Sequence, residues 1–541
     1  MSLILVCLLG ALSFALCKLL VFLLRRPHGI DLDGPNKGNW LIGNITELFE
    51  GGVDYCVHIA EKYGGAVRLH GPDGETIYVS DPLALYHIVV KDQHIFVDSN
   101  KLVFGEGLIS TTGEQHHRQR KLLNPFFSTS NMRRLLTIVH PIADILTSSL
   151  VAEVPTNGLH KEIDMLPWLS RCAFDGVWQG VLGYHSNTLS TAENDSYTGD
   201  VGHELMKDVR DLRRIAEAMD RGSRKALAKK KAAFGLDDTM HSADSVSGEG
   251  DKKPSSQVKD IMDIMLKAKS MSSDPEWLTD SELLGQMNVM VFAGLDTTTS
   301  ALTRCVYLLA QHPSAQARVR SEIRDAIKSS AHEEHIDVLS AELPYDVLMN
   351  LPFLDGVVKE TLRMYPSLPL MARRATKATT LPLHFPTRSR SGADTSTVVL
   401  PKGTCIVISI LAANRHRGMW DVDVPFDEDD TAPAPKSSAP LPSIKDGMRY
   451  PGVYSNMMTF LGGSRSCIGF KFAEMEIIIA SLMLRLHVAL PTEPNAEGHV
   501  KEIQWKLGGS HIPVVKPPAG DGVTPQVPLN VRLVTEEDFV R

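Results

Sequence analysis

The 541-residue sequence lacks several features that mark common classes of protein. Its seven cysteines are scattered, with no CxxC pair and no regular spacing. This pattern argues against a disulfide framework and fits reduced thiols in a protein that faces the cytosol. The net charge of −8 argues against a general nucleic-acid-binding protein. The chain also has no internal repeat and no glycine-rich fingerprint for a flavin or a nucleotide.

Long apolar runs are absent beyond the N-terminus. Residues 2–24 are apolar apart from Lys18 and a few small residues, and an arginine pair and a proline follow. Because about 20 helical residues cross a bilayer, we expect one transmembrane anchor within residues 1–26 and a main domain over residues 27–541. A cleaved signal peptide is the alternative, but its basic residues precede the apolar run. Basic residues on the C-terminal flank favour a cytosolic main domain, which we expect at the endoplasmic reticulum.

Helical periodicity dominates the middle of the chain. Residues 66–80 alternate like a β-hairpin, whereas residues 82–380 show mainly helical patterns broken by proline and glycine. Residues 236–259 are polar and poor in aromatics, which predicts a mobile surface loop. The basic stretch 221–231 is typical of a solvated helix face, with a docking site as the alternative. We therefore expect a mainly α fold with a small β portion.

The segment FLGGSRSCIG, residues 460–469, concentrates glycine and serine around one cysteine, Cys467. We expect a helix to follow directly, over residues 470–490. A cysteine at a helix start meets unpaired N–H groups and the positive end of the helix dipole, and Arg465 adds a positive charge, so thiolate is favoured. A single thiolate without a second cysteine suits one axial bond to a metal better than a zinc cage. A buried free cysteine in a glycine-rich turn is the alternative.

The spacing F-x-x-G-x-R-x-C-x-G in this segment resembles the haem-binding loop of the cytochrome P-450 family. The resemblance implies haem b as cofactor, with Cys467 as the axial thiolate ligand of the iron. It also implies that Arg465 is directed at a haem propionate and that Phe460 packs beside the thiolate loop. The implied fold is the mainly helical cytochrome P-450 fold, preceded by one N-terminal transmembrane helix.

Residues 278–312 predict one long helix, which Asp280 or Ser281 could cap and which Pro313 ends. Its middle reads AGLDTT, residues 293–298. Glycine weakens a helix and threonine hydroxyls can bond back to carbonyls, so we expect a local opening with a route for protons. An ordinary cluster of polar residues is the alternative.

The AGLDTT segment resembles the oxygen-activating motif of the same family. That resemblance implies Asp296 as the acid and Thr297 as the alcohol of a proton relay. It also implies that Ala293 and Gly294 leave room for dioxygen.

Glu360 and Arg363 lie three residues apart, where side chains of one helix can pair. Most such pairs are ordinary surface ion pairs. Here the surroundings, VVKETLRMYPSLPL, resemble the family's buried structural pair. The resemblance also implies that Arg374, on a following strand, reaches a haem propionate, with Arg373 as the weaker candidate.

Residues 113–127, GEQHHRQRKLLNPFF, resemble the family's G-x-x-W-x-x-x-R helix, with His116 in place of the usual tryptophan. A histidine N–H can donate a hydrogen bond as an indole does, so His116 and Arg120 become candidate propionate partners. A basic surface helix is the alternative. Residues 413–436 contain no counterpart of the family's proline–glutamate–arginine segment, so Glu360 and Arg363 are expected to lack a third partner.

Together these motifs predict a haem-thiolate monooxygenase that inserts one oxygen atom from O2 into a hydrophobic small molecule such as a terpenoid, steroid, fatty acid or aromatic compound. The style of the motifs resembles fungal members and hints at secondary metabolism. We expect an NADPH-cytochrome reductase as electron donor, the membrane as a partner, and no nucleic acid. The alternatives are a haem-thiolate desaturase or isomerase on the same fold, or a haem-binding sensor without turnover.

Overall fold

The computed structural model describes residues 13, 29–39, 42–97, 105–183, 188–189, 209–233, 260–271, 277–330, 343–420, 444–471 and 476–539. The predicted membrane anchor (with the exception of Ser13), the predicted mobile loop 236–259 and residues 421–436 of the segment 413–436 lie outside these residues.

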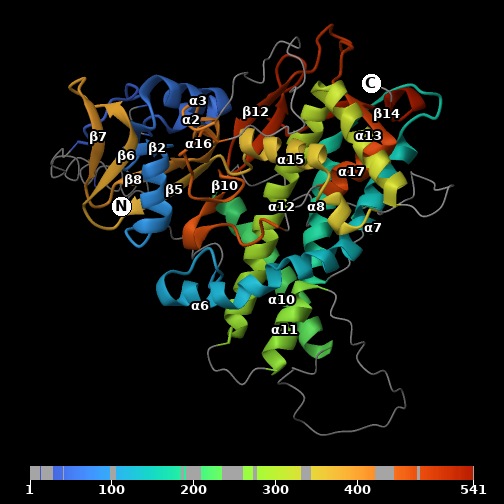
Figure 1. The fold of residues 1–541 in the computed structure, drawn as a ribbon, viewed down its shortest axis with the longest axis horizontal. Coiled ribbons are helices and arrows are strands. Elements are labelled where there is room, and N and C mark those ends of the chain that lie inside the picture. Colours follow the sequence, from blue (N-terminus) through green and yellow to red (C-terminus); the bar gives the residue numbers. More distant parts are fainter. Residues whose placement is uncertain are drawn as a thin grey trace, which may run out of the picture.

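A strand-rich portion and a helical body make up the described chain (Figure 1). The strands are β1 (Ala66–Gly71), β2 (Gly74–Val79), β3 (Phe96–Val97), β4 (Lys161–Asp164), β5 (Leu370–Ala375), β6 (Thr379–Arg388), β7 (Asp394–Leu400), β8 (Cys405–Ser409), β9 (Gly452–Tyr454), β10 (Met457–Gly462), β11 (Leu486–Ala489), β12 (Ile503–Leu507), β13 (His511–Val515) and β14 (Pro528–Leu533). The predicted mainly α fold with a small β portion is confirmed.

The main sheet has the strand order β1-β2-β8-β5-β3. The predicted hairpin is confirmed, because β1 and β2 pair antiparallel from Ala66 opposite Val79 to Gly71 opposite Gly74. Strand β8 pairs parallel with β2 and antiparallel with β5, which brings the segment after residue 400 beside the N-terminal hairpin. Strands β6 and β7 form a separate hairpin, and so do β12 and β13.

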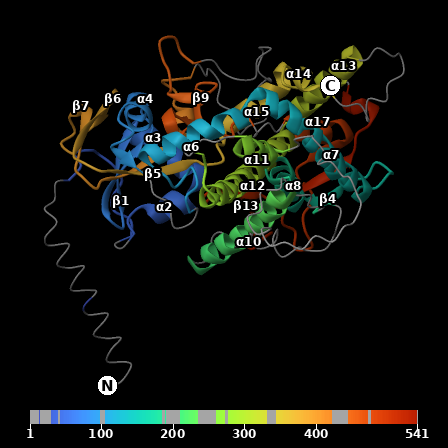
Figure 2. The same cartoon turned by 90° about the horizontal axis from the view of Figure 1, so that it is seen from below.

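The α-helices are α2 (Ile45–Glu50), α3 (Gly52–Tyr63), α4 (Pro82–Tyr86), α6 (Gly113–Leu123), α7 (Thr129–Glu153), α8 (Met165–Leu182), α10 (Val209–Ala233), α11 (Ile261–Met271), α12 (Asp280–Gln311), α13 (Pro313–Ser330), α14 (Tyr345–Leu348), α15 (Pro352–Met364), α16 (Ile410–Arg415) and α17 (Glu476–Arg485). Short π and 3-10 turns are η1 (His87–Lys91), η2 (Asn124–Phe127), η3 (Gly463–Arg465) and η4 (Glu536–Phe539). Figure 2 shows α2, α3 and α4 among the strands of the main sheet, and the longer helices α7, α8, α10 and α12 to one side of them.

Helix α12 runs through the centre of the helical body (Figure 1). Its 32 residues span about 48 Å at 1.5 Å per residue. The predicted cap at Asp280 or Ser281 is wrong: Thr279 is the N-cap and forms a capping box with Glu282. The predicted end is confirmed, since His312 is the C-cap and α13 begins at Pro313. Helix α8 packs along α12, and most residues of α8 are buried.

The helix predicted directly after Cys467 differs from the structure in two ways. Residues 468–471 form a turn, and α17 is described only from Glu476 to Arg485. The chain from Leu486 to Ala489 is strand β11, which pairs with β14. An apolar run of this length fits a helix or a buried strand equally well, and pairing with a distant strand decides between them.

Among the described residues, α7 is the one helix with the length and apolar composition to cross a membrane. It packs against α8 and α17, so we interpret it as part of the helical body. Helix α10 carries the basic stretch 221–231, and Arg221, Arg224, Lys225 and Lys229 are exposed as predicted. Lys230 instead binds the carboxylates of Asp260 and Asp263.

Candidate functional site

Cys467 lies on a tight loop that follows β10 and the short turn η3. Its backbone N–H donates a 2.9 Å hydrogen bond to the carbonyl of Phe460, which closes the loop. Gly463 has a φ of +67°, and a Cβ there would lie 1.9 Å from the carbonyl oxygen of Val89. Only glycine fits at this position, both for its backbone conformation and for the close approach of η1. The glycine-rich sequence thus fixes the shape of the loop.

The thiol of Cys467 lies deep among protein atoms, yet its side chain keeps an accessible face. Burial raises the pKa of this thiol, while the backbone N–H of Gly469 and the charge of Arg120 act in the opposite direction. The sequence pointed to Arg465 as the positive charge beside the sulfur, but the structure gives this position to Arg120. A group with a donor N–H, a nearby cation and an accessible sulfur is suited to binding a metal as thiolate.

Arg465 points from the loop toward the segment before α6. Its two Nη atoms donate to the carbonyls of Leu108, at 3.3 Å, and Thr111, at 2.6 Å. The backbone N–H of Leu108 in turn donates to Oε1 of Gln286 on α12, at 3.0 Å. The segment from Leu108 to Thr111 therefore connects the cysteine loop to the central helix.

Helix α6 adds further polar groups on the same side. Nη2 of Arg120 donates to Oγ of Ser466 at 3.0 Å, and Nη1 donates to the carbonyl of the same residue. His116 is buried, and burial together with the charges of Arg465 and Arg120 lowers its pKa to about 4. Two guanidinium groups and a neutral buried imidazole thus surround the cysteine loop, an arrangement suited to carboxylate groups of a bound cofactor.

The AGLDTT segment lies within α12, which is helical without interruption from Asp280 to Gln311, so the predicted local opening of the helix is wrong. Oγ1 of Thr297 donates to the carbonyl of Ala293 at 2.6 Å, so the predicted back-bonded threonine is confirmed. Oγ of Ser367 donates to the carbonyl of Thr297 at 2.8 Å. Burial raises the pKa of Asp296, and a hydrogen bond from Ser510 opposes this shift. An acid and an alcohol are therefore adjacent on this helix.

Gly294 has a different role from the one expected. A Cβ at this position would lie 2.7 Å from Cγ2 of Val177 on α8. The missing side chain therefore allows α8 to pack closely against α12, and the space at Gly294 is taken by Val177. Of the two residues expected to leave room for dioxygen, Ala293 and Gly294, only the half-buried Ala293 remains a candidate.

The cysteine loop and the central helix share one apolar environment. Ile468, directly after Cys467, packs against a cluster of buried residues that includes Leu108 on the connecting segment and Val291 and Leu295 on α12. The four site candidates Cys467, Arg465, His116 and Arg120 are thus brought together on one side, and Asp296 and Thr297 lie on the helix that faces them through this cluster.

Glu360 and Arg363 form the predicted buried pair on α15, with Nε–Oε2 and Nη2–Oε1 distances of 2.7 and 2.6 Å. Nη1 of Arg363 donates to the carbonyl of Asn414 at 2.6 Å, and the guanidinium lies over the ring of Trp420 at 5.0 Å. Among the described residues, a backbone carbonyl and an aromatic ring occupy the positions around Arg363, and no second arginine bonds Glu360.

Arg374 is held by two contacts at the main sheet. It lies on the exposed face of β5, where Nη2 pairs with Asp73 at 2.9 Å and Nη1 donates to the carbonyl of Gly403 at 3.0 Å. Arg373, the weaker candidate, is the buried residue of the two. Because side chains alternate along a strand, only one of two consecutive arginines can face inward, and the register of β5 selects Arg373.

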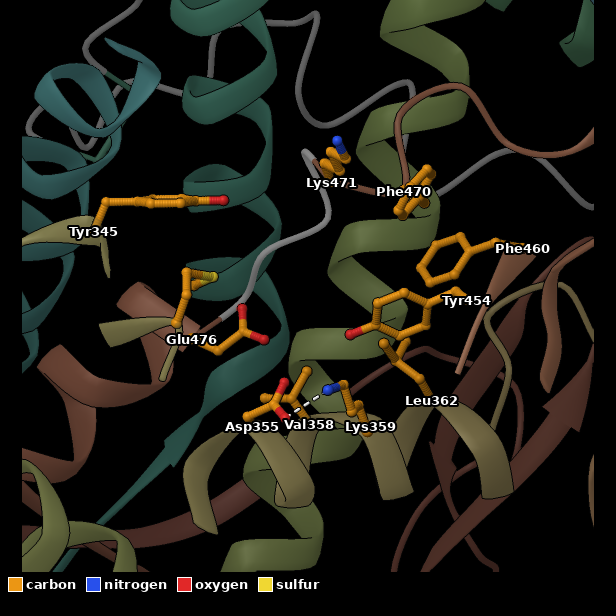
Figure 3. A pocket seen from close by; sticks show the side chains of 11 residues that line it. Tyr345, Asp355, Val358, Lys359, Leu362, Tyr454, Phe460, Phe470, Lys471 and Glu476 are labelled. Atoms are coloured by element: carbon orange, nitrogen blue, oxygen red, sulfur yellow. Dashed lines mark hydrogen bonds and ion pairs between the residues drawn. The ribbon is translucent and has the colours of Figure 1, made fainter. Parts of the chain in front are cut away.

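Phe460 borders a pocket of about 200 Å³ on the other side of the cysteine loop (Figure 3). Its ring stands edge-on to Tyr454 at 5.2 Å and lies 6.2 Å from Phe470. The ion pair between Lys359 and Asp355 lies at the floor of this pocket. The predicted packing of Phe460 beside the thiolate loop agrees with these contacts.

Sequence reasoning missed two groups near these residues. Ser510 contacts Asp296 from the turn between β12 and β13, and Ser367 bonds Thr297 from the segment after α15. Ser510 has no local sequence signal, because a single serine beside two glycines resembles any turn. Ser367 lies in a mostly apolar stretch, SLPLM, and a single serine there has no specific signal in the sequence.

Comparison with known proteins supports one family. The sequence profile of the Cytochrome P450 family matches residues 33–497. The chain is 33% identical to cytochrome P450 monooxygenase 91 of Postia placenta, over 92% of this chain and 93% of the relative. It is 34% identical to monooxygenase 219 of the same fungus, over 98% and 100%, and 31% identical to a ganoderic acid synthetase of Ganoderma lucidum, over 98% of both. Enzymes of this family carry haem with a cysteine thiolate on the iron. The chain therefore belongs to the cytochrome P450 family and is a haem-thiolate monooxygenase with that family's fold.

Proposed function

We propose that this enzyme inserts one atom of O2 into a hydrophobic small molecule bound beside α12, with electrons that come from NADPH through a separate reductase. The observation that carries the proposal is the connection between the cysteine loop and the acid–alcohol helix: Arg465 bonds Leu108, and Leu108 bonds Gln286 on α12. The cysteine loop and α12 would thus border the same haem site.

In this proposal the thiolate of Cys467 would hold the haem iron, and the bound haem would supply the binding and reductive activation of O2. His116, Arg120 and Arg465 hold the propionates. The donor set fits the group, because the three side chains form a positively charged, partly buried cluster around one accessible sulfur. We assign the second propionate contact on the sheet side to Arg373 in place of Arg374, since Arg374 is paired with Asp73.

Asp296 and Thr297 would hold and move protons on the side of α12 that borders the proposed haem site. The hydroxyl of Thr297 donates its own proton to the carbonyl of Ala293, so its oxygen is left to accept a hydrogen bond from a water molecule. Burial raises the pKa of Asp296 and so favours its protonated form, in which the carboxyl can donate a proton. Together they hold a water and supply it with a proton.

We expect residues 101–109, 287–297 and 367–371 to line the substrate pocket. Because these segments are mostly apolar, the proposed substrate is hydrophobic. The kinship with a ganoderic acid synthetase supports a role in fungal secondary metabolism. Residues 1–26 serve as a membrane anchor at the endoplasmic reticulum, with the catalytic domain in the cytosol. This arrangement brings an apolar substrate and a membrane-bound reductase to the same surface.

The proposal is tested with membranes that contain the full-length protein and an NADPH-cytochrome reductase. These membranes are incubated with a fungal lipid extract under labelled ¹⁸O2, and the products are compared by mass spectrometry. We expect NADPH-dependent products that carry one labelled oxygen atom and that are absent with Cys467→Ser. Oxygen-dependent products without label would contradict oxygen insertion and would assign the enzyme to desaturation.

A further inference from the structure

Arg304, in the second half of α12, is a buried cation held between two aromatic rings. Its guanidinium carbon lies 3.4 Å from the centre of the Trp505 ring on β12 and 4.1 Å from the centre of the Tyr365 ring after α15. Tyr307, one turn further along α12, stands edge-on to the same indole at 5.5 Å. Arg304 is only 4% exposed. The two rings attract the cation and orient it, but they offer no hydrogen-bond acceptor to its N–H groups.

No carboxylate among the described residues balances the charge of Arg304. The ionisable groups that act on it are Tyr365, Tyr307 and Arg415, and the last of these is a second cation. Burial lowers the pKa of Arg304 to about 9, so the guanidinium is still charged at neutral pH. The ring of His511 stands edge-on to Tyr365 at 6.5 Å, and burial together with the two arginine charges holds its pKa well below the ordinary value. A buried charge without a counter-charge is strongly destabilising, so this site favours an anion.

One edge of the Arg304 guanidinium is available to such an anion. Its Nε and Nη2 are buried and have no hydrogen-bond partner within the described part of the chain. On Arg363 the same edge holds Glu360, with Nε–Oε2 and Nη2–Oε1 distances of 2.7 and 2.6 Å. The indole Nε1 of Trp505 is a further buried donor that no described residue accepts from. Two parallel N–H donors match the two oxygens of a carboxylate group.

We propose that the Nε–Nη2 edge of Arg304 is a binding site for one carboxylate group, which accepts two parallel hydrogen bonds from the guanidinium and supplies its counter-charge. The site stands independently of the proposed haem chemistry.

The carboxylate has two possible sources. Oγ of Ser367, two residues after Tyr365, donates to the carbonyl of Thr297 at 2.8 Å. The segment 365–367 therefore runs along α12 from Arg304 to the AGLDTT segment, over about 10 Å of helix axis. The group belongs either to a small free acid or to the acidic end of a longer ligand whose body lies toward that segment. The longer ligand would add an acidic end to the proposed hydrophobic substrate.

The test uses the full-length holoenzyme with sodium acetate as the small carboxylate and sodium chloride at equal ionic strength as the reference. Acetate should raise the midpoint of thermal unfolding saturably, by about 1–2 °C at roughly ten times its dissociation constant, because it binds the folded protein alone. Arg304→Gln should lose this rise. Arg304→Lys keeps the charge without the planar edge and should bind acetate roughly tenfold more weakly. Arg318→Gln is the matched control, since Arg318 also lies over an aromatic ring, that of Phe353 at 4.1 Å, but is exposed.

A second measurement does not require the arginine variants to fold. Tryptophan fluorescence of the holoenzyme is titrated with acetate, and Trp505→Phe keeps an aromatic ring beside Arg304 while it removes the signal of the adjacent indole. The acetate-dependent change should be present in the wild type and absent in Trp505→Phe. Dodecanoate and methyl dodecanoate distinguish the sources of the carboxylate. A response to dodecanoate, but to neither acetate nor the ester, would assign the site to the acidic end of a long ligand.

Four results would overturn the inference. They are a wild type that responds to neither carboxylate, an equal response to chloride, a response that persists in folded Arg304→Gln, and an acetate-dependent fluorescence change that persists in Trp505→Phe. A response to dodecanoate that the methyl ester matches would count with the first of these, because it reports apolar contact and not recognition of the carboxylate.

Discussion

Arg363 binds Glu360 through two parallel hydrogen bonds of 2.7 and 2.6 Å within a single helix, and both side chains are buried. The same guanidinium reaches the carbonyl of Asn414, just before the region that leads to the cysteine loop. The pair therefore fixes α15 to α16. A bidentate pair with all its contacts made is a rigid connection between two parts of the chain.

We expect Glu360→Gln to destabilise the protein by about 3–5 kcal/mol, because it leaves the buried guanidinium of Arg363 without a counter-charge. Denaturant unfolding and the haem content after purification measure the effect. The matched control is Asp355→Asn on the same helix, which breaks the more exposed pair with Lys359 and should cost less than about 0.5 kcal/mol. Equal losses in the two variants would contradict a structural role for the buried pair.

Replacement of Cys467 by serine should abolish the absorption band that thiolate ligation gives to the reduced carbon-monoxide complex. A serine hydroxyl does not supply a thiolate ligand to the iron. Difference spectra of purified protein provide the measurement. Cys405→Ser is the control, since Cys405 lies on β8 in the sheet, and this variant should keep the band. A normal spectrum in Cys467→Ser would disprove the proposed ligand.

Thr297→Ala should lower the ratio of product to NADPH consumed and raise the release of hydrogen peroxide, while haem content stays near normal. The loss of one participant in proton transfer costs about 10²–10⁴-fold in that step, and water can replace part of it. Thr299→Ala is a matched control, because Thr299 makes the same back-bond, to the carbonyl of Leu295 at 2.9 Å. The prediction fails if the ratio of product to NADPH consumed is the same in both threonine variants as in the wild type.

Arg373→Ala should accelerate the loss of haem to an acceptor globin, whereas Arg374→Ala should not. Arg373 is on the buried face of β5, and Arg374 is half exposed in an ion pair with Asp73 that is worth at most about 1 kcal/mol. The rate of haem transfer at fixed temperature distinguishes the two residues. Faster loss from Arg374→Ala than from Arg373→Ala would restore the original assignment of Arg374.

The stability of the protein should fall in acid partly through His487. Burial and the charge of Arg532 lower the pKa of His487 to about 4. The unfolded chain binds a proton at His487 near pH 6.5. The stability that the folded protein gains from the lowered pKa is therefore fully present above that pH, and it is lost as pH falls toward about 4. By about pH 5 the loss amounts to about 2 kcal/mol.

The measurement is the free energy of unfolding of the wild type and of His487→Gln at several pH values. His487→Gln should show a smaller decline between about pH 7 and pH 5 than the wild type. Parallel curves for the two proteins would show that His487 does not titrate as described.

The sequence determined the local parts of this protein. The cysteine loop, the AGLDTT segment and the Glu360–Arg363 pair each depend on residues within a few positions of one another, so their geometry follows from helix and turn rules. The β1–β2 hairpin and the end of α12 at Pro313 were predictable for the same reason. These features were sufficient to indicate the family and its cofactor.

Tertiary structure alone decided which side chains meet. Strand register chose Arg373 over Arg374, pairing with β14 turned Leu486–Ala489 into a strand, and helix packing gave the space beside Gly294 to Val177. It also placed Ser510 against Asp296 and Arg120 beside Cys467. Such contacts join residues far apart in the chain, and only the packing of whole elements fixes their distances, because local propensity carries no information about the partner.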